Sequence, residues 1–308
     1  MNSLLLFILL TIACQHFPNA DGFHEVIDEK ESIYLGLVQG ITEYLPVSST
    51  GHLILFDNLF QKAEAKKVTN TCERFYDKDE VKNSYFTIIQ SGSILAVLFL
   101  YPRRFKNMIY GIFGKDKNGA KLVENLVISF LPVAVVGLLV NRLVQKFFYN
   151  KISIAAALAI GAIIMLISEK NLLKNAKYQH GDIDHMDLKK SLIVGMWQCL
   201  SLFPGMSRSM TTIVGGYKCG LSRKSSAEYS FLLGFITLSA ATIFKIATDF
   251  SILFANLRLR TIVIGVLIAF LSSLVSMKLF ISYLSRHGMK VFAIYRLLLS
   301  CIILYTTV

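Results

Sequence analysis

Long apolar runs recur along the whole 308-residue chain, and short polar stretches separate them. Each uninterrupted run lies near the roughly 20 residues that an α-helix needs to cross a bilayer. The runs predict membrane segments at 34–60, 86–101, 122–140, 152–168, 191–217, 228–248, 260–282 and 291–308. Two of them are interrupted, the first at Pro46 and the second at Pro204-Gly205. We therefore expect an all-α fold, a polytopic transmembrane bundle in which two helices are broken.

The formal net charge of +12 raises the question of a nucleic-acid partner. The basic residues are concentrated in one short loop, where Asp116 is the acidic residue and the basic ones are Arg103, Arg104, Lys106, Lys115, Lys117 and Lys121. Such a cluster is typical of a cytoplasmic loop of a membrane protein. The partner expected from this charge is the lipid bilayer and not nucleic acid. Topology stays ambiguous, because Arg142, Lys146 and Lys151 crowd the next turn.

The N-terminal segment 1–22 contains an apolar run from Leu4 to Ala13, which is short for a membrane span. It suits the apolar core of a signal peptide, although no basic residue precedes it. A cleaved signal, an extra uncleaved helix and a wrongly assigned start codon all stay open. Residues 33–308 are expected to form one membrane-embedded domain with a polar insertion at 61–84. The five cysteines form no CxxC pair, so they imply neither a zinc site nor a disulfide framework.

Two polar cassettes lie at the interruptions: a first cassette, Glu43–His52, and a second cassette, Pro204–Thr212. A charged side chain at the centre of a span costs about 2.5–3.5 kcal/mol, so such groups usually face a cavity and have a function. Each cassette has a proline that ends one helix, followed by Ser and Thr residues that can cap the next. A helix N-terminus at membrane depth attracts anions, as in the discontinuous helices of transporters.

The flanks of the two cassettes also correspond, since Gly36 and Gln39 stand before the first as Gly195 and Gln198 stand before the second. This correspondence predicts a duplicated core whose broken helices converge on one site. Two helix N-termini, several hydroxyls and the guanidinium of Arg208 would bind a highly charged anion, and Arg binds phosphate oxygens in pairs. A phosphate or diphosphate is the anion expected in a membrane cavity.

Ser49 and His52 stand three residues apart, so they would share one face of a helical turn. A Ser activated by a His is a standard nucleophile pair, and Glu43 could orient the imidazole or handle the second proton. Simple helix capping by Ser48, Ser49 and Thr50 is the alternative explanation. For His52 it is a structural polar role.

The cassettes also carry a resemblance to a known family. The chain resembles the undecaprenyl-diphosphatases of the bacitracin-resistance family from about residue 33 to residue 308. The matching motifs are Gln39–His52, Ile89–Val97, Pro204–Ser209, Leu221–Leu233 and Phe292–Arg296. One departure concerns the acidic motif, where Gln39 stands in place of the family's frequent Glu. A mechanism that needs two carboxylates would then rest on Glu43 alone.

The resemblance implies hydrolysis of undecaprenyl diphosphate to undecaprenyl phosphate and inorganic phosphate, which recycles the lipid carrier of peptidoglycan synthesis. It further implies inverted repeats with two re-entrant helix pairs, the bacterial cytoplasmic (inner) membrane, an active site facing the exterior, and a divalent cation, Mg²⁺ or Ca²⁺. The implied catalytic residues are Glu43, Ser49, His52 and Arg208. The implied substrate-binding residues are Ser48, Thr50, Gly51, Ser207, Ser209 and Thr212. The implied metal ligands are Glu43 and Gln39.

Three alternatives stay open. A lipid-phosphate carrier or flippase would bind the same anion without hydrolysing it. The other superfamily of membrane lipid phosphatases needs a His and then an Asp after its Ser-Arg pair, and neither follows Ser207-Arg208 closely here. The sequence does not distinguish a monomer from a homodimer.

Overall fold

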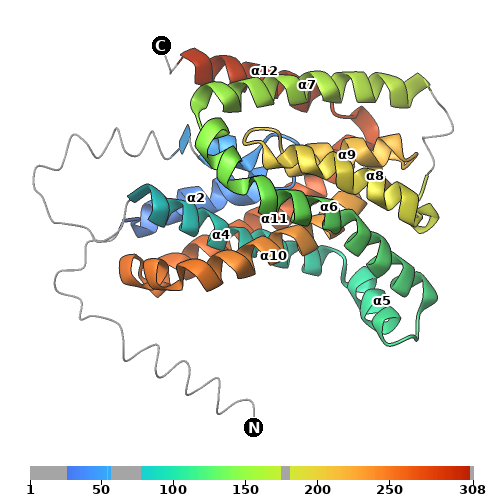
Figure 1. Ribbon diagram of the computed structural model, residues 1–308, viewed down its shortest axis with the longest axis horizontal. Coiled ribbons are helices and arrows are strands. Elements are labelled where there is room, and N and C mark those ends of the chain that lie inside the picture. The colour runs from blue at the N-terminus through green and yellow to red at the C-terminus, as the bar shows by residue number, and fades with distance from the viewer. Residues whose placement is uncertain (1–25, 54, 57–77, 175–180, 306–308) are drawn as a thin grey trace, which may run out of the picture.

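A computed structural model describes residues 26–53, 55–56, 78–174 and 181–305 (Figure 1). The regular elements in these ranges are helices, and no strand occurs among them. The long helices are α4 (Lys78–Leu100), α6 (Lys117–Phe148), α7 (Lys151–Lys174), α10 (Arg223–Asn256) and α11 (Leu259–His287). The shorter ones are α2 (Glu29–Thr42), α5 (Pro102–Ile112), α8 (Leu188–Cys199), α9 (Arg208–Lys218) and α12 (Lys290–Tyr305). The prediction for residues 1–22 lies outside the described residues.

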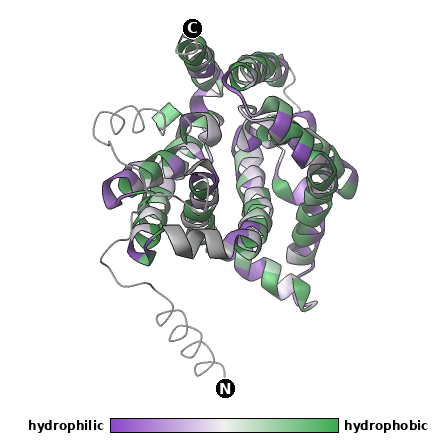
Figure 2. Cartoon of the chain, turned by 60° about the vertical axis from the view of Figure 1, so that its left-hand side comes forward, coloured by the Kyte–Doolittle hydropathy of each residue, from purple (hydrophilic) through white to green (hydrophobic). Residues whose placement is uncertain are grey.

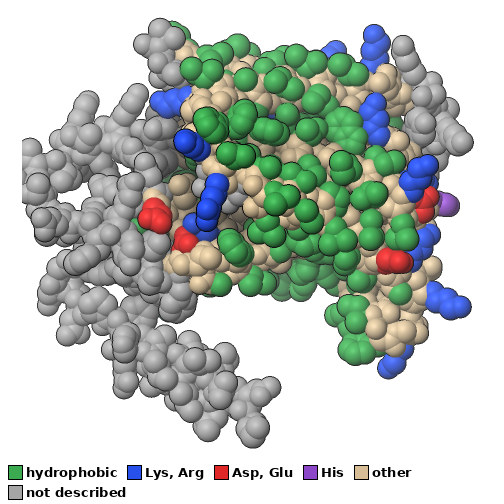
Figure 3. Space-filling model, in the orientation of Figure 1, with side chains coloured by type: hydrophobic (Ala, Val, Ile, Leu, Met, Phe, Trp, Pro, Cys, Tyr) green, Lys and Arg blue, Asp and Glu red, His purple; other side chains and the backbone are tan. Residues whose placement is uncertain are grey.

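Within the described residues, five helices are long and apolar enough to cross a membrane: α4, α6, α7, α10 and α11. They coincide with five of the predicted segments, and the sixth uninterrupted one corresponds to the shorter α12. Hydrophobic residues occur along most of the length of the helices (Figure 2). On the face shown in Figure 3, apolar side chains cover the middle of the molecule, and Lys and Arg gather towards its two ends. Leu138 and Leu139 are about three-quarters exposed, as expected of side chains that face lipid. The all-α polytopic fold is thereby confirmed.

Both interrupted segments are broken where the prolines predicted. In the first, α2 ends at Thr42 and a new helix begins at Ser49. In the second, α8 is followed by a short 3-10 turn, Leu200–Leu202, and α9 starts at Arg208. In each of the two segments, a tight turn inside the bundle thus joins the helix that ends to a second helix, which runs back towards the face from which the first one came.

The structure adds detail in two connecting segments. The basic loop contains a helix, α5, which begins with Pro102 at its first turn and leaves Ile109 and Ile112 exposed among its basic residues. Its amphipathic pattern was hidden by the charge cluster. The predicted insertion at 61–84 overlaps α4, because the polar residues from Lys78 onward are helical. One of them, Lys82, forms a buried ion pair with Glu31 of α2. Residues 57–77 lie outside the described part.

The duplicated core appears as two matching sets of helix contacts. Helix α2 packs on α11, and α8 packs on α6. A Cβ added at Gly36 would lie 2.6 Å from the carbonyl oxygen of Gly265, and one added at Gly195 would lie 2.5 Å from that of Ser129. Only glycine permits both approaches. Each half of the chain therefore lends one long helix to the other half.

The buried hydrogen bonds repeat in the same way. The Tyr85 hydroxyl of α4 donates to Ser32 at 2.7 Å, and the Tyr229 hydroxyl of α10 donates to Ser191 at 3.3 Å. Helix α2 starts beside the start of α11, where Arg260 pairs with Glu29. The segment before α8 instead lies beside α5, where Asp184 pairs with Arg104. The two broken helices therefore enter the bundle from opposite faces, as an inverted repeat requires.

Candidate active site

Each cassette turn is closed by a serine in a left-handed conformation. Ser48 has φ 71° and Ser207 has φ 72°, the only positive φ values among the described non-glycine residues. The Ser48 hydroxyl accepts a hydrogen bond from the Gly51 amide, and the Ser207 hydroxyl accepts one from the Met210 amide, both at 3.4 Å. Such a backbone conformation costs of order 1–3 kcal/mol and clusters at functional sites. The two halves of the chain thus carry equivalent strained serine caps, and the N-termini of the two cassette helices lie close together at these caps.

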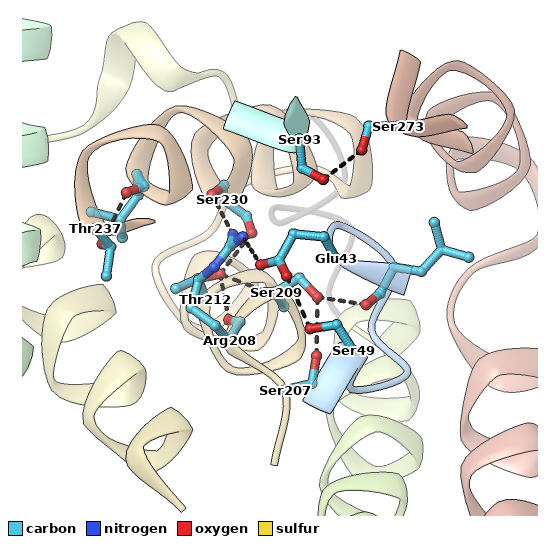
Figure 4. A network of polar contacts seen from close by, with 12 residues as sticks. Glu43, Ser49, Ser93, Ser207, Arg208, Ser209, Thr212, Ser230, Thr237 and Ser273 are labelled. Atoms are coloured by element: carbon cyan, nitrogen blue, oxygen red, sulfur yellow. Dashed lines mark hydrogen bonds and ion pairs between the residues drawn. The ribbon is translucent and has the colours of Figure 1, made fainter. Parts of the chain in front are cut away.

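Glu43 joins the two cassettes (Figure 4). Its Oε1 accepts a hydrogen bond from Arg208 Nη2 at 3.1 Å. Its Oε2 accepts from the Ser49 hydroxyl at 2.9 Å and from Gln39 Nε2 at 2.8 Å. A second direct bond runs from the Ser209 hydroxyl to the Leu45 carbonyl at 2.7 Å. The predicted convergence of the broken helices is therefore present as a carboxylate, a hydroxyl and a guanidinium in direct contact.

Arg208 lies at the edge of this group, and not all of its N–H donors are hydrogen-bonded. Its Nη1 donates to the Ser230 carbonyl at 3.1 Å, and its guanidinium lies 5.0 Å from the centre of the Tyr44 ring. Its Nε is buried and has no hydrogen-bond partner among the described residues. A buried donor without a partner is costly, so this guanidinium is well placed to receive an anion.

The site opens into a cavity of about 160 Å³. At about 30 Å³ each, roughly five water molecules would fill it. Glu43 and Arg208 are the charged members of its lining, which otherwise consists of Ser48, Ser49, Thr50, Gln90, Ser201, Phe203, Pro204, Gly205, Ser207 and Leu238. A second cavity of about 740 Å³ shares Ser49, Thr50 and Gln90 with the first and extends to Glu80 and Lys245. These two residues lie at the ends of α4 and α10 away from α5, so the combined cavity points to that face.

Most of the predicted site residues line this space. Of the substrate-binding candidates, Ser48, Thr50 and Ser207 line the smaller cavity. Gln39, a candidate metal ligand, lines the larger one. Gly51, Ser209 and Thr212 line neither cavity. They are held within the cassettes instead: the Gly51 amide donates to the Ser48 hydroxyl, and the Ser209 hydroxyl donates to the Leu45 carbonyl. The Thr212 hydroxyl donates to the Arg208 carbonyl at 2.9 Å and bonds to the Ser230 hydroxyl at 2.7 Å. In this structure they support the residues that line the cavity.

The expected contact between Ser49 and His52 is not formed. The Ser49 hydroxyl turns back to Glu43, whereas His52 Nδ1 lies 2.8 Å from the Ser48 carbonyl oxygen and Nε2 lies 2.6 Å from the Tyr295 hydroxyl. A carbonyl only accepts, so Nδ1 carries a proton. Ser49 and His52 do lie in one helical turn, as the spacing predicted. Each side chain, however, bonds to a residue farther away in the chain, Ser49 to Glu43 and His52 to Tyr295. The residue in contact with the Ser49 hydroxyl is Glu43.

Two polar residues that line the smaller cavity were not among the sequence candidates. Gln90, in the middle of α4, lines both cavities, and Ser201 lines the smaller one from the turn after α8. Gln90 is a polar side chain deep within an apolar span, which is the signal that would have identified it. Ser201 has no comparable signal, since it becomes a lining residue only through the geometry of the second turn.

A model of the family "Bacitracin resistance protein BacA" matches residues 32–302. The chain belongs to this family. It is 35% identical over 274 residues to the undecaprenyl-diphosphatase of Clostridium tetani, covering 89% of this chain and 94% of that protein. It is 38% identical over 273 residues to the undecaprenyl-diphosphatase of Thermoanaerobacter pseudethanolicus, covering 87% and 92%. The undecaprenyl-diphosphatase of Neisseria gonorrhoeae is 35% identical over 274 residues, covering 89% and 93%.

Proposed function

We propose that this member of the BacA family hydrolyses undecaprenyl diphosphate to undecaprenyl phosphate and inorganic phosphate. Its close similarity to several undecaprenyl-diphosphatases supports the substrate. The observation that carries the proposal is the direct contact of Glu43, Ser49 and Arg208 at the meeting point of two helix N-termini. These groups provide a base, a nucleophile and an anion-binding cation within one small cavity. Recycling of the lipid carrier and resistance to bacitracin follow from this activity.

In the proposed reaction, the Ser49 oxygen attacks the terminal phosphorus of the diphosphate. The bond from that phosphorus to the bridging oxygen breaks, and undecaprenyl phosphate leaves with its electron pair. The Ser49 proton passes to Glu43 Oε2, which lies 2.9 Å away. Glu43 gives this proton to the departing undecaprenyl phosphate and is again a carboxylate. Water then attacks the phosphorus of the phosphoserine and loses a proton to Glu43. The bond from that phosphorus to the Ser49 oxygen breaks, Glu43 passes the proton to this oxygen, and inorganic phosphate is released. Serine is a weak nucleophile unless a base adjoins it, and this carboxylate is that base.

Arg208 would stabilise the charge on the transferred phosphoryl group. Arg208 lines the smaller cavity together with Ser48 and Ser207, the two serines that cap the starts of the cassette helices. Catalysis of phosphoryl transfer consists chiefly of positioning and electrostatic stabilisation. Direct attack by water, with Ser49 as a phosphate ligand, remains the competing route. Trapping of a phosphorylated Ser49 distinguishes the two.

A divalent cation belongs to the proposal. The oxygen donors near the diphosphate position are the Glu43 carboxylate, the Gln39 amide oxygen and the Ser49 hydroxyl, the donor type that Mg²⁺ and Ca²⁺ prefer. The described residues contain no group of three His, Cys, Asp or Glu that could form a complete cage. The donors therefore fit a cation that takes further ligands from substrate and water, held by Glu43 and Gln39. When bound, it would supply neutralisation of diphosphate charge.

We further propose that the combined cavity opens to the outer side of the bacterial cytoplasmic membrane. The densest basic cluster lies around α5, which favours the cytoplasm for that face. The cavity extends to Glu80 and Lys245 at the other face, where acidic and basic residues are mixed. A diphosphate lipid in the outer leaflet would reach Ser49 through this opening.

The test is phosphate release by purified protein with C55 and C15 prenyl diphosphates, with and without a chelator. We expect wild-type release of one phosphate per lipid, loss of release on chelation, and almost none from Ser49→Ala. Ser285→Ala, an exposed serine of α11, is the matched control and should retain full activity. Binding of the lipid without phosphate release would favour the carrier or flippase alternative, because inverted repeats with broken helices also occur in transporters.

A further inference from the structure

A second guanidinium lies beneath the site. Arg296 of α12 is completely buried, and no acidic side chain pairs with it among the described residues. Four of its five N–H donors go to carbonyl oxygens: Nε to Leu158 at 3.2 Å, Nη1 to Pro46 at 3.2 Å, and Nη2 to Ala157 at 3.2 Å and Gly205 at 3.0 Å. Burial of a charge is expensive unless its hydrogen bonds are satisfied, and here four are made.

Two of these four acceptors are the turns of the cassettes themselves. Pro46 lies two residues before the strained Ser48, and Gly205 lies two residues before the strained Ser207. The other two acceptors belong to α7, which runs beside α12 (Figure 1). The planar fork of one guanidinium therefore links both turns to the same pair of helices. An ammonium group has no such fork and could not reproduce these directions.

The surroundings are shaped to admit this group. Gly161 of α7 lies against Arg296, and a Cβ built there would overlap the Nη2 atom. Gly205 has φ +95°, a conformation that directs its carbonyl to Arg296 and that L side chains rarely adopt. Both glycines thus favour the approach of the guanidinium to the second turn.

We propose that Arg296 is a positioning residue for the reaction: it fixes the two cassette turns relative to each other and so sets the contacts of Glu43 with Ser49 and with Arg208. The inference rests on the proposed hydrolysis. Because its partners are uncharged, the positive charge of Arg296 also remains uncompensated below the cavity and favours an anion there. The preceding residue, Tyr295, holds His52 and with it the Ser48 carbonyl, so α12 supports the first turn by two routes.

The test compares Arg296→Lys, Gly161→Ala and a matched control, Ser300→Ala. The Ser300 hydroxyl donates to the Ala155 carbonyl at 2.7 Å, so this control disturbs the same α7–α12 interface without touching either turn. We measure the melting temperature, kcat and KM with undecaprenyl diphosphate, each in the wild-type and in an Arg208→Lys background. Gly161→Ala displaces the guanidinium without removing it, which keeps the test valid if Arg296→Lys does not fold.

We expect Arg296→Lys and Gly161→Ala to lower kcat at least about tenfold with little change in KM, and Ser300→Ala to retain wild-type kcat. In the Arg208→Lys background the same changes should cost less than about threefold, because residues that act through one contact are non-additive. Wild-type turnover by a folded Arg296→Lys or Gly161→Ala protein overturns the inference. Equal losses in both backgrounds also overturn it, since they indicate a general structural defect. Absence of wild-type phosphate release would instead refute the proposed function.

Discussion

Replacement of Arg208 by alanine is the perturbation with the largest expected effect on turnover. Arg208 is the cationic member of the smaller cavity, it contacts Glu43 at 3.1 Å, and its Nε is free to bind a ligand. Loss of one preorganised donor at a transition state lowers kcat about 100- to 1,000-fold, which corresponds to about 2.7–4 kcal/mol. We expect Arg208→Ala to fall in or above this range. Arg208→Lys should recover little, because an ammonium lacks the paired donors.

Stability has to be separated from catalysis in this experiment. Arg208 and Glu43 are both nearly buried, with side chains 9% and 6% exposed. Removal of one partner of a buried ion pair destabilises a protein by about 3–5 kcal/mol, because the other charge is left unpaired. The double variant Glu43→Gln with Arg208→Gln removes both charges and should recover most of that stability, while activity stays low.

The assay is steady-state phosphate release in detergent at saturating undecaprenyl diphosphate, normalised to the folded fraction from thermal melting. A folded Arg208→Ala protein whose kcat lies within about threefold of wild type would refute the electrostatic role assigned to this residue.

Three further predictions follow from individual contacts. Ser49→Ala should abolish the acid-stable phosphoserine that is trapped during turnover. His52→Gln should still form this phosphoserine, at a reduced rate, because His52 contacts Ser48 and Tyr295 and not Ser49. A phosphoserine that persists in Ser49→Ala would exclude Ser49 as the nucleophile. In a metal titration of activity, Gln39→Glu should respond at lower Mg²⁺ concentration than wild type, since it adds a second anionic ligand, and Glu43→Gln should lose most activity; an unchanged metal response in both would remove these residues from the cation site. Gly36→Leu should lower the melting temperature strongly because the side chain would overlap Gly265, and an unaffected melting temperature would contradict the close helix contact.

The sequence was sufficient for the helices and the cassettes because both depend on local properties. An apolar run has few folding options in a bilayer. A proline followed by Ser and Thr residues favours the end of one helix and the start of another, so the breaks at Pro46 and Pro204 could be predicted. Pro132 has no such residues after it and lies inside the continuous helix α6. The repeat of Gly36 and Gln39 at Gly195 and Gln198 indicated the duplication, which the matching contacts on α11 and α6 bear out. The domain boundaries at 33 and 308 and the insertion at 61–84 remain predictions.

The partners of individual side chains could not be predicted, because they depend on contacts between segments far apart in the chain. Ser49 was paired with His52 from helical spacing, but Tyr295, 243 residues further on, occupies the imidazole. Arg296 was visible only as the last residue of a motif, and nothing in its neighbours indicates four backbone acceptors from three segments. Helix α5 could not be predicted for a different reason, because a dense basic cluster is typical of a connecting loop and its apolar face is short.

The central claim is that the two converging cassettes cleave a lipid diphosphate and do not merely bind it. The most direct measurement is ³¹P NMR of undecaprenyl diphosphate incubated with the purified protein and a divalent cation, run beside Ser49→Ala and Ser285→Ala. We predict that the diphosphate signals are replaced by equal signals of undecaprenyl phosphate and inorganic phosphate in wild type and Ser285→Ala, and that they persist with Ser49→Ala. Unchanged diphosphate signals in the presence of folded, lipid-binding wild-type protein would contradict the account.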